Sequence, residues 1–350
     1  MEVKALKFGG LTAKRPIVQG GMGVGVSLSS LAGNVAKCGG VGTISGVHPG
    51  YREADFKENP FRANLRAIGN ELEKAKEIAN GGIIGFNFMT VMNHYEEYVK
   101  EAIAAGADFI VSGAGLPVNL AKYAAGTRAV ILPIVSSARA LKLIVKQWQR
   151  ADRLPDAVVV EGPLAGGHLG YPYGHLVDGT FDTLEDSLVD VVDYVRELEE
   201  KNGVKIPVVA GGGVRNYADM ERLMALGASG VQVGTKFVAT EECDAAPAFK
   251  QAYLRSRKED VQLIESPVGL AARAIRNSFL EKVEKQGRIP VQRCYQCMNH
   301  CKQAETKYCI SQALIDAVQG REGLVFCGAN AYEIEKLSTV EKVMQELCGE

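Results

Sequence analysis

The fold is decided by the stretch Val158-Val159-Val160-Glu161-Gly162-Pro163-Leu164-Ala165-Gly166-Gly167-His168-Leu169-Gly170. Its β-branched start favours a strand that is buried on both faces. The glycines that follow let the backbone come close to a flat ligand. His168 has an unperturbed pKa near neutrality, so it can take up and return a proton. Since α/β enzymes keep their chemistry at the C-terminal ends of strands, this stretch predicts a strand that ends at a catalytic site.

The same strand pattern recurs through the first two thirds of the chain. Eight strand candidates are Pro16–Gln19, Val41–Ile44, Ile83–Phe88, Asp108–Ser112, Ala129–Val135, Asp156–Glu161, Ile206–Ala210 and Gly230–Gly234. Helical spacing of apolar residues separates most of them, at Ala63–Ala79, Tyr95–Ala105, Ala138–Gln149, Leu184–Lys201 and Asn216–Leu226. This alternation predicts an α/β fold, a (β/α)₈ TIM barrel. A doubly wound sheet is the alternative, but the segment 20–25 fits its Gly-x-Gly-x-x-Gly turn poorly.

After about residue 240 the alternation is lost. We expect residues 1–240 to form the barrel and residues 241–350 to form a mostly helical C-terminal cap with a cysteine-rich segment at 294–309. Helical patterns in the cap are Ala248–Arg257 and Ala271–Lys285. The longest strand-to-helix connection, Leu169–Thr183, follows His168 directly and is a candidate lid.

Composition excludes several classes of protein. The 350 residues are 47% hydrophobic and 23% charged, which is ordinary for a globular enzyme. The net charge of -1 gives no basic field to attract nucleic acid. The segment Met1–Lys7 lacks the apolar stretch of a signal peptide, and no apolar run is long enough to span a bilayer. These features predict a cytoplasmic protein that binds neither membranes nor nucleic acid.

In a barrel, the C-terminal ends of all strands meet at one mouth. The loops after strands seven and eight, 211–213 and 234–235, occupy the usual phosphate positions and favour FMN over a larger dinucleotide. Asn87 could bond the polar edge of a flavin, and Met22 could pack on its face. The alternative is that the glycines only form tight turns. The candidate cofactor residues are Gly20, Gly21, Met22, Gly23, Asn87, Ser136, Glu161, Gly166, Gly167, Gly211, Gly212, Gly213, Gly234 and Thr235.

Four of the eight cysteines lie in one short stretch, Cys294-x₂-Cys297-x₃-Cys301-x₇-Cys309. In a chain without signs of secretion, such a run indicates a metal before disulfides. Four thiolates in a compact run suit a [4Fe–4S] cluster. A zinc site, in which His300 could replace one cysteine, is the alternative.

Five motifs resemble the nitronate monooxygenase superfamily, which also contains the FMN-dependent enoyl-acyl-carrier-protein reductases. They are the segments Pro16–Gly23, Gly113–Gly115, Ala165–Gly170, Ala210–Gly213 and Gly230–Thr235. The resemblance implies an FMN-bearing TIM barrel with His168 in the position of the catalytic histidine.

Further segments are similar to one branch of that superfamily, the flavin- and [4Fe–4S]-dependent acyl-carrier-protein dehydrogenase/isomerase of bacterial unsaturated fatty acid synthesis. They are Val24–Ser27, Leu31–Lys37, Glu161–Leu164, Ser266–Gly269, Ala272–Ile275 and Tyr308–Ile310. This resemblance implies an acyl-carrier protein or CoA thioester as substrate, His168 as general acid/base, and an electron acceptor or NAD(P)H as redox partner. A homodimer is the default oligomer for such enzymes.

Two other functions compete with this interpretation. A nitronate monooxygenase would oxidise a small alkyl nitronate with oxygen, and that chemistry does not call for an iron–sulfur cluster. A barrel without flavin would use the glycine loops to bind a sugar phosphate.

Overall fold

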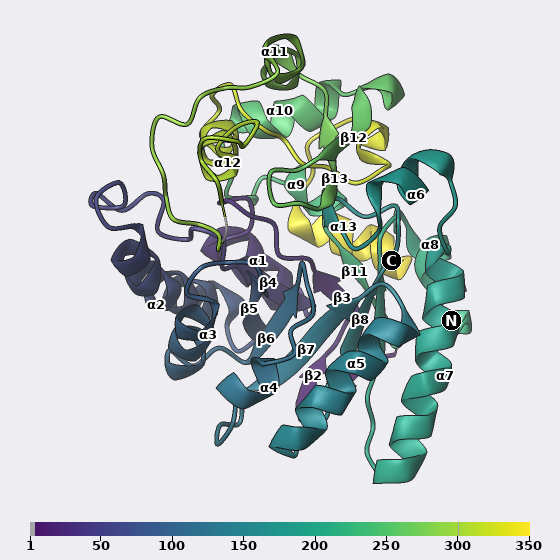
Figure 1. The fold of residues 1–350 in the computed structure, drawn as a ribbon. Coiled ribbons are helices and arrows are strands. Elements are labelled where there is room, and N and C mark those ends of the chain that lie inside the picture. Colours follow the sequence, from purple (N-terminus) through teal and green to yellow (C-terminus); the bar gives the residue numbers. More distant parts are fainter. Residues whose placement is uncertain (1–3, 300) are drawn as a thin grey trace.

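The computed structural model describes residues 4–299 and 301–350. Eight parallel strands close into one barrel, so the expected TIM barrel is confirmed (Figure 1). Each strand candidate corresponds to one barrel strand, with shifts of one or two residues at the ends. The strands are β3 (Ile17–Gln19), β4 (Val41–Ser45), β5 (Ile83–Met89), β6 (Phe109–Gly113), β7 (Val130–Val135), β8 (Val158–Glu161), β10 (Val208–Gly211) and β11 (Gly230–Val233).

Helices surround the barrel and pack their apolar sides against it. Helix α7 illustrates how the sequence sets their ends: Thr183 and Asp186 form a reciprocal capping box, and Gly203 stops the helix with a left-handed φ of 65°. No helix in the described part of the chain is both long and apolar enough to cross a membrane. The surrounding helices are α1 (Ser29–Lys37), α2 (Pro60–Ala79), α3 (Tyr95–Ala104), α4 (Leu120–Tyr123), α5 (Ala138–Trp148), α7 (Leu184–Asn202), α8 (Tyr217–Ala225) and α9 (Thr235–Val238), with a 3₁₀ turn η1 (Gln149–Ala151).

An N-terminal hairpin closes the end of the barrel opposite the mouth. Strands β1 (Leu6–Phe8) and β2 (Leu11–Ala13) pair antiparallel, and Leu6 and Phe8 join the apolar cluster inside the barrel. Phe8 meets Phe109 edge-on with ring centroids 6.2 Å apart. Apolar side chains therefore pack the interior at this end of the barrel, and the large cavity lies toward the mouth.

The cap lies over the mouth (Figure 1) and contains a small sheet as well as helices. The segment Ala271–Lys285, expected to be helical throughout, instead forms β13 (Ala271–Ile275) followed by α11 (Ser278–Gln286). Pairing on both edges of β13 overrides the helical preference of its alanines. The remaining elements here are β9 (Gly167–Leu169), α6 (Tyr173–Asp178), α10 (Pro247–Arg255), η2 (Lys258–Asp260), β12 (Val261–Glu265), α12 (Ile310–Val318) and η3 (Ala331–Glu333).

The last helix returns from the cap to the barrel. Helix α13 (Val340–Cys348) packs against α1, α8 and α9 (Figure 1). Lys236 of α9 forms an ion pair of 2.8 Å with Glu346, and Arg15 pairs with Glu350. The division of the chain at residue 240 stays a prediction, and the structure adds that the C-terminal helix belongs to the wall of the barrel.

Candidate active site

A cavity of about 590 Å³ lies at the mouth of the barrel beneath the cap. Its size is that of a site for a cofactor or a drug-sized ligand. Thirteen of the residues singled out from the sequence line it, namely Gly20, Gly21, Met22, Gly23, Asn87, Glu161, Gly166, Gly167, His168, Gly212, Gly213, Gly234 and Thr235. Ser136 and Gly211 do not. Ser136 lies against Gly170, and Gly211 packs on Gln232 inside the sheet.

Glycine at several lining positions is required by close packing or by backbone conformation. A Cβ on Gly21 would overlap the side chain of Asn87. Gly212 and Gly213 have φ values of 105° and 88°, which other residues rarely adopt. Side chains are therefore excluded at Gly21, Gly212 and Gly213. This leaves backbone atoms of these loops in the cavity floor, where a ligand can contact them directly.

His168 is held at the edge of the cavity by the cap. It lies on β9, where it pairs with Ala272 of β13, and its Nε2 is 2.8 Å from Ser266 Oγ. Its ring meets Phe326 edge-on at 5.0 Å. Burial lowers the pKa of His168 to about 4, so the imidazole is neutral at physiological pH. With Nε2 engaged by Ser266, Nδ1 is the ring nitrogen left to exchange a proton with a ligand.

Glu161 ends strand β8 and also lines the cavity. Burial raises the pKa of its carboxyl group to about 8, so it carries a proton at neutral pH. The cavity therefore offers a neutral base in His168 and a neutral acid in Glu161. Environments that push two pKa values apart in this way are typical of acid–base sites.

The cap also supplies residues that line the cavity and that no sequence motif predicted. The segment 326–330 runs along the cavity, and Gly166 crosses it so closely that a Cβ there would lie 2.6 Å from the carbonyl carbon of Cys327. Gly328 N–H donates to Thr235 Oγ1 at 3.1 Å, which ties this segment to the barrel loop after β11. Burial raises the pKa of the Cys327 thiol to about 12, so it stays protonated. These residues reach the site only through tertiary packing.

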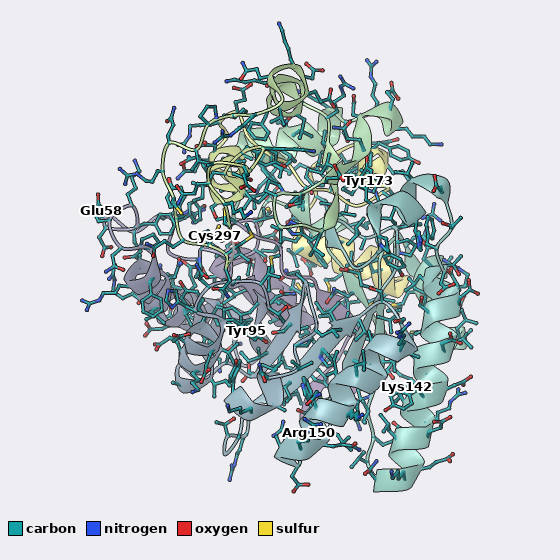
Figure 2. All side chains as sticks on the ribbon, viewed as in Figure 1. Glu58, Tyr95, Lys142, Arg150, Tyr173 and Cys297 are labelled. Carbon is teal, nitrogen blue, oxygen red and sulfur yellow. The ribbon has the colours of Figure 1, made fainter. Side chains whose placement is uncertain are left out.

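The cysteine segment lies where the cap meets the barrel (Figure 2). The pKa of Cys297 is raised to about 11, chiefly by burial and in smaller part by the charges of Cys309, Cys301 and Cys294. The charge of Cys294 also raises the pKa of Cys301 and of Cys309. No group of three or more His, Cys, Asp or Glu side chains is drawn together at ligand distance among residues 4–299 and 301–350, and His300 lies outside the described residues.

Backbone bonds tie this segment to the loop that follows β5. Asn93 N–H donates to Cys297 O at 3.1 Å, and the Asn93 amide donates to Gln296 O at 2.7 Å. Met92 and Met298 form an antiparallel bridge. The cysteine segment is thus attached to the loop that continues β5, the strand whose Asn87 and Met89 line the cavity.

The fold and this cavity define a TIM-barrel enzyme with its site at the C-terminal ends of the strands. The chain belongs to the nitronate monooxygenase family, whose model matches residues 4–350. Members are oxidoreductases, and flavin dependence is typical of them. The glycine-lined floor and the two phosphate-position loops fit FMN.

Curated relatives carry the same family description. A probable nitronate monooxygenase of Staphylococcus saprophyticus is 26% identical over 306 residues, covering 81% of this chain and 82% of the relative. One from Staphylococcus aureus strain Newman is 26% identical over 303 residues, covering 80% and 81%.

Solved structures share the fold. FabK from Thermotoga maritima matches with a TM-score of 0.72 and 23% identity, covering 96% of this chain and 92% of that one. A nitroalkane oxidase from Streptomyces ansochromogenes matches with a TM-score of 0.68 and 20% identity, covering 97% and 96%. The enoyl reductase domain of MlnA from Bacillus amyloliquefaciens matches with a TM-score of 0.69 and 16% identity, covering 95% and 93%.

Proposed function

We propose that this protein is an FMN-dependent oxidoreductase of acyl or enoyl thioesters in fatty acid synthesis, and that Cys294, Cys297, Cys301 and Cys309 hold a [4Fe–4S] cluster. The observation that carries the proposal is the run of four cysteines in the short segment 294–309, which backbone bonds tie to the loop that follows β5. An iron–sulfur cluster needs four cysteine sulfurs that face one point. Oxidation of a small nitronate uses no such centre.

The residues of the cavity divide into two groups by what they would hold. The loops at Gly212, Gly213, Gly234 and Thr235 would take the phosphate of FMN, and Gly21, Met22 and Asn87 would lie against its ring. When bound, FMN supplies a hydride acceptor. The wall toward the cap is apolar and would line an acyl chain, through Val24, Val26, Val238, Phe249, Leu314 and Leu324.

The acid–base work falls to His168 and Glu161. Neutral His168 would remove a proton from the carbon next to the thioester carbonyl. That carbonyl makes the proton more acidic. Protonated Glu161 donates a hydrogen bond to an oxygen that gains negative charge. In a separate step on the resulting 2-enoyl thioester, neutral His168 would take a proton from the γ carbon and return it to the α carbon, which would move the double bond one position along the chain. In the reverse direction, with NAD(P)H as the reductant, the same groups would serve an enoyl reductase.

The substrate would arrive on an acyl-carrier protein or on CoA. Carrier proteins are acidic. Exposed basic residues on α5 are Arg139, Lys142 and Lys146, and Arg150 follows in η1; Figure 2 labels Lys142 and Arg150. We propose this surface for docking, in a cytoplasmic homodimer that binds neither nucleic acid nor membrane.

Anaerobic mixing with a medium-chain acyl-carrier protein tests the proposal. We expect the absorbance of the oxidised flavin to bleach, and metal analysis to find iron rather than zinc. Cys297→Ser and Cys301→Ser should lose the iron, whereas Cys38→Ser, which alters a thiol outside the segment, should keep it.

The family description and the curated relatives favour a second candidate, oxidation of alkyl nitronates with oxygen. Rapid turnover of an alkyl nitronate in air, with no bleaching by acyl-carrier protein, would replace the thioester proposal with this one. A protein that purifies without any flavin would instead support the sugar-phosphate barrel.

A further inference from the structure

Strand β13 pairs along one edge with two different segments of the chain. Ala272 pairs with His168 of β9, and Ala274 forms an antiparallel bridge with Phe326. Partners in an antiparallel pair point to the same face of a sheet, and residues two apart on one strand also share a face. His168 and Phe326 therefore stand next to each other on one face, beside two alanines whose small side chains leave room for both rings.

The contacts of the two rings agree with this register. The rings of His168 and Phe326 meet edge-on with their centroids 5.0 Å apart. Phe326 also reaches the turn before the histidine, since a Cβ on Gly167 would lie 3.9 Å from Phe326 Cδ2. Ser266 Oγ lies 2.8 Å from the Nε2 of the same imidazole. A hydrogen bond at one nitrogen and an aromatic ring beside the imidazole together limit its rotation.

Phe326 is itself held firmly in place. The hydroxyl of Tyr253 on α10 donates to Phe326 O, and this tyrosine is only 3% exposed, so water does not compete for the bond. Two backbone bonds tie the segment to β13, namely Ile275 N–H to Val325 O at 2.9 Å and Cys327 N–H to Arg273 O at 3.1 Å. Phe326 therefore has little freedom to move away from His168.

Two ionisable side chains lie near this pair of rings. Glu161 lines the same cavity and is protonated at neutral pH, and the guanidinium of Arg273 donates to Ala165 O. Burial lowers the pKa of His168 to about 4, and neither of these two groups contributes to that shift. The apolar ring of Phe326 supplies part of this burial, because it covers one side of the imidazole.

We propose that Phe326 is a positioning residue for His168, whose ring holds the imidazole in one orientation and keeps water from it, so that the histidine meets the substrate as a neutral base. This rests on the proposed role of His168 as general base. A base that is displaced by 1 Å can lose ~10²-fold in rate, so a fixed orientation matters for the chemistry.

The test follows the ring signal of His168 by NMR in flavin-loaded protein labelled with ¹³C-histidine, with the signal assigned by its loss in His168→Ala. In the wild type this signal should not move between pH 5 and pH 8, because the pKa is about 4. In Phe326→Ala water reaches the imidazole, so its pKa should rise toward the ordinary 6.5 and the signal should move within that range. Phe326→Tyr keeps the ring and should behave as the wild type.

Activity gives a second readout of the same variants. At saturating flavin we expect Phe326→Ala to lower kcat by ~10- to 100-fold. The acid limb of its pH profile should move to higher pH, because the base is neutral only above its pKa. Tyr253→Phe, which removes the bond to Phe326 O, should shift both readouts the same way by less. Phe61→Ala is the matched control: it removes a ring that lies 4.2 Å from another histidine, His94, and should change neither readout.

The outcomes separate this inference from the proposed function. A still His168 signal and an unchanged acid limb in folded Phe326→Ala overturn the inference and leave the general base in place. Failure of Phe326→Tyr to restore both readouts overturns it too, because the ring is then not the cause. If Phe326→Ala does not fold, Tyr253→Phe decides by the same readouts. Full activity in His168→Ala overturns the general base itself, and the part of Phe326 in the reaction with it.

Discussion

Burial acts in opposite directions on the charges of two side chains of the cavity, His168 and Glu161. It removes the charge from His168 and keeps the proton on Glu161, so both are neutral at physiological pH. Loss of contact with water is the physical cause of both shifts in pKa. A neutral base and a neutral acid in one cavity suit the removal of a carbon-bound proton, because charge then develops only as the reaction proceeds.

Replacing His168 should therefore stop the chemistry and leave the flavin bound. We expect His168→Ala to lower kcat by ~10²- to 10⁴-fold, the usual contribution of a general base. In the wild type, kcat should fall as the pH approaches about 4 and again above about 8. His175→Ala, which alters an exposed histidine on α6, should keep both the rate and its pH profile. A similar loss of kcat in both variants would show that His168 is not the general base.

Glu161 should make folding less favourable as the pH rises. In the unfolded chain the carboxyl ionises near its ordinary pKa of 4.5, whereas in the folded protein it stays protonated to about 8. Stability is lost between these values, because there the unfolded state binds fewer protons than the folded state. We expect Glu161→Gln to raise Tm more at pH 8 than at pH 5, measured by circular dichroism on flavin-free protein. An equal effect at both pH values would contradict the burial of this carboxyl.

Gly21 leaves no room for a side chain between the backbone and Asn87. A Cβ would push into Asn87, so Gly21→Ala should weaken flavin binding at least ~10-fold, a loss of ~1.4 kcal/mol. Gly69→Ala is the control, because a Cβ on that helical glycine meets open space. It should leave the flavin Kd unchanged and increase stability by ~0.5–1 kcal/mol. Fluorescence titration of the flavin-free protein with FMN measures both.

Much of the cavity could be predicted from the sequence, because its floor consists of glycines directly after apolar runs. Ser136 was expected there by the same rule, but its hydroxyl turns to Gly170 instead. The segment 326–330 could not be found, since it has no motif and reaches the cavity from far along the chain. The contact between Phe326 and His168 could not be predicted either, because β13 brings these two residues together only in the folded protein.

At the scale of elements, all eight barrel strands follow from apolar runs that end in small or polar residues. Such strands are buried on both faces, which leaves a strong local signal. Strand β13 was missed because Ala271, Ala272 and Ala274 favour a helix in isolation. Its register with β9 and β12 is a long-range pairing that local spacing does not encode.

The crossing of Gly166 with the segment 326–328 makes a prediction at this scale. Gly166→Ala would place a Cβ against backbone atoms, which cannot move aside as a flexible side chain can. We expect β9 to shift, with lower flavin affinity and a lower Tm. Gly174→Ala in α6, where a Cβ meets open space, should change neither. Unaltered flavin binding in Gly166→Ala would show that the segment 326–328 of the cap does not pack against Gly166 as described.

Across the whole molecule, stability depends on the return of α13 to the barrel. Met344 is fully buried on that helix, and a Cβ on Gly40 would lie 2.7 Å from its Cε. We expect Met344→Ala to lower the free energy of unfolding by ~2–5 kcal/mol, measured by urea denaturation. Lys342→Ala, on the exposed side of α13, should cost less than ~0.5 kcal/mol. Equal losses in the two variants would mean that the helix is not docked.

The pairing of β9 with β13 has a consequence for protein engineering. The strand that carries His168 and the strand that fixes its register come from different halves of the chain, so neither half can be exchanged alone. In a hybrid that takes its C-terminal half from a relative, the strand that carries His168 would pair with a β13 from the other parent. Working hybrids should be those in which residues 167–169 and 271–275 are taken from the same parent.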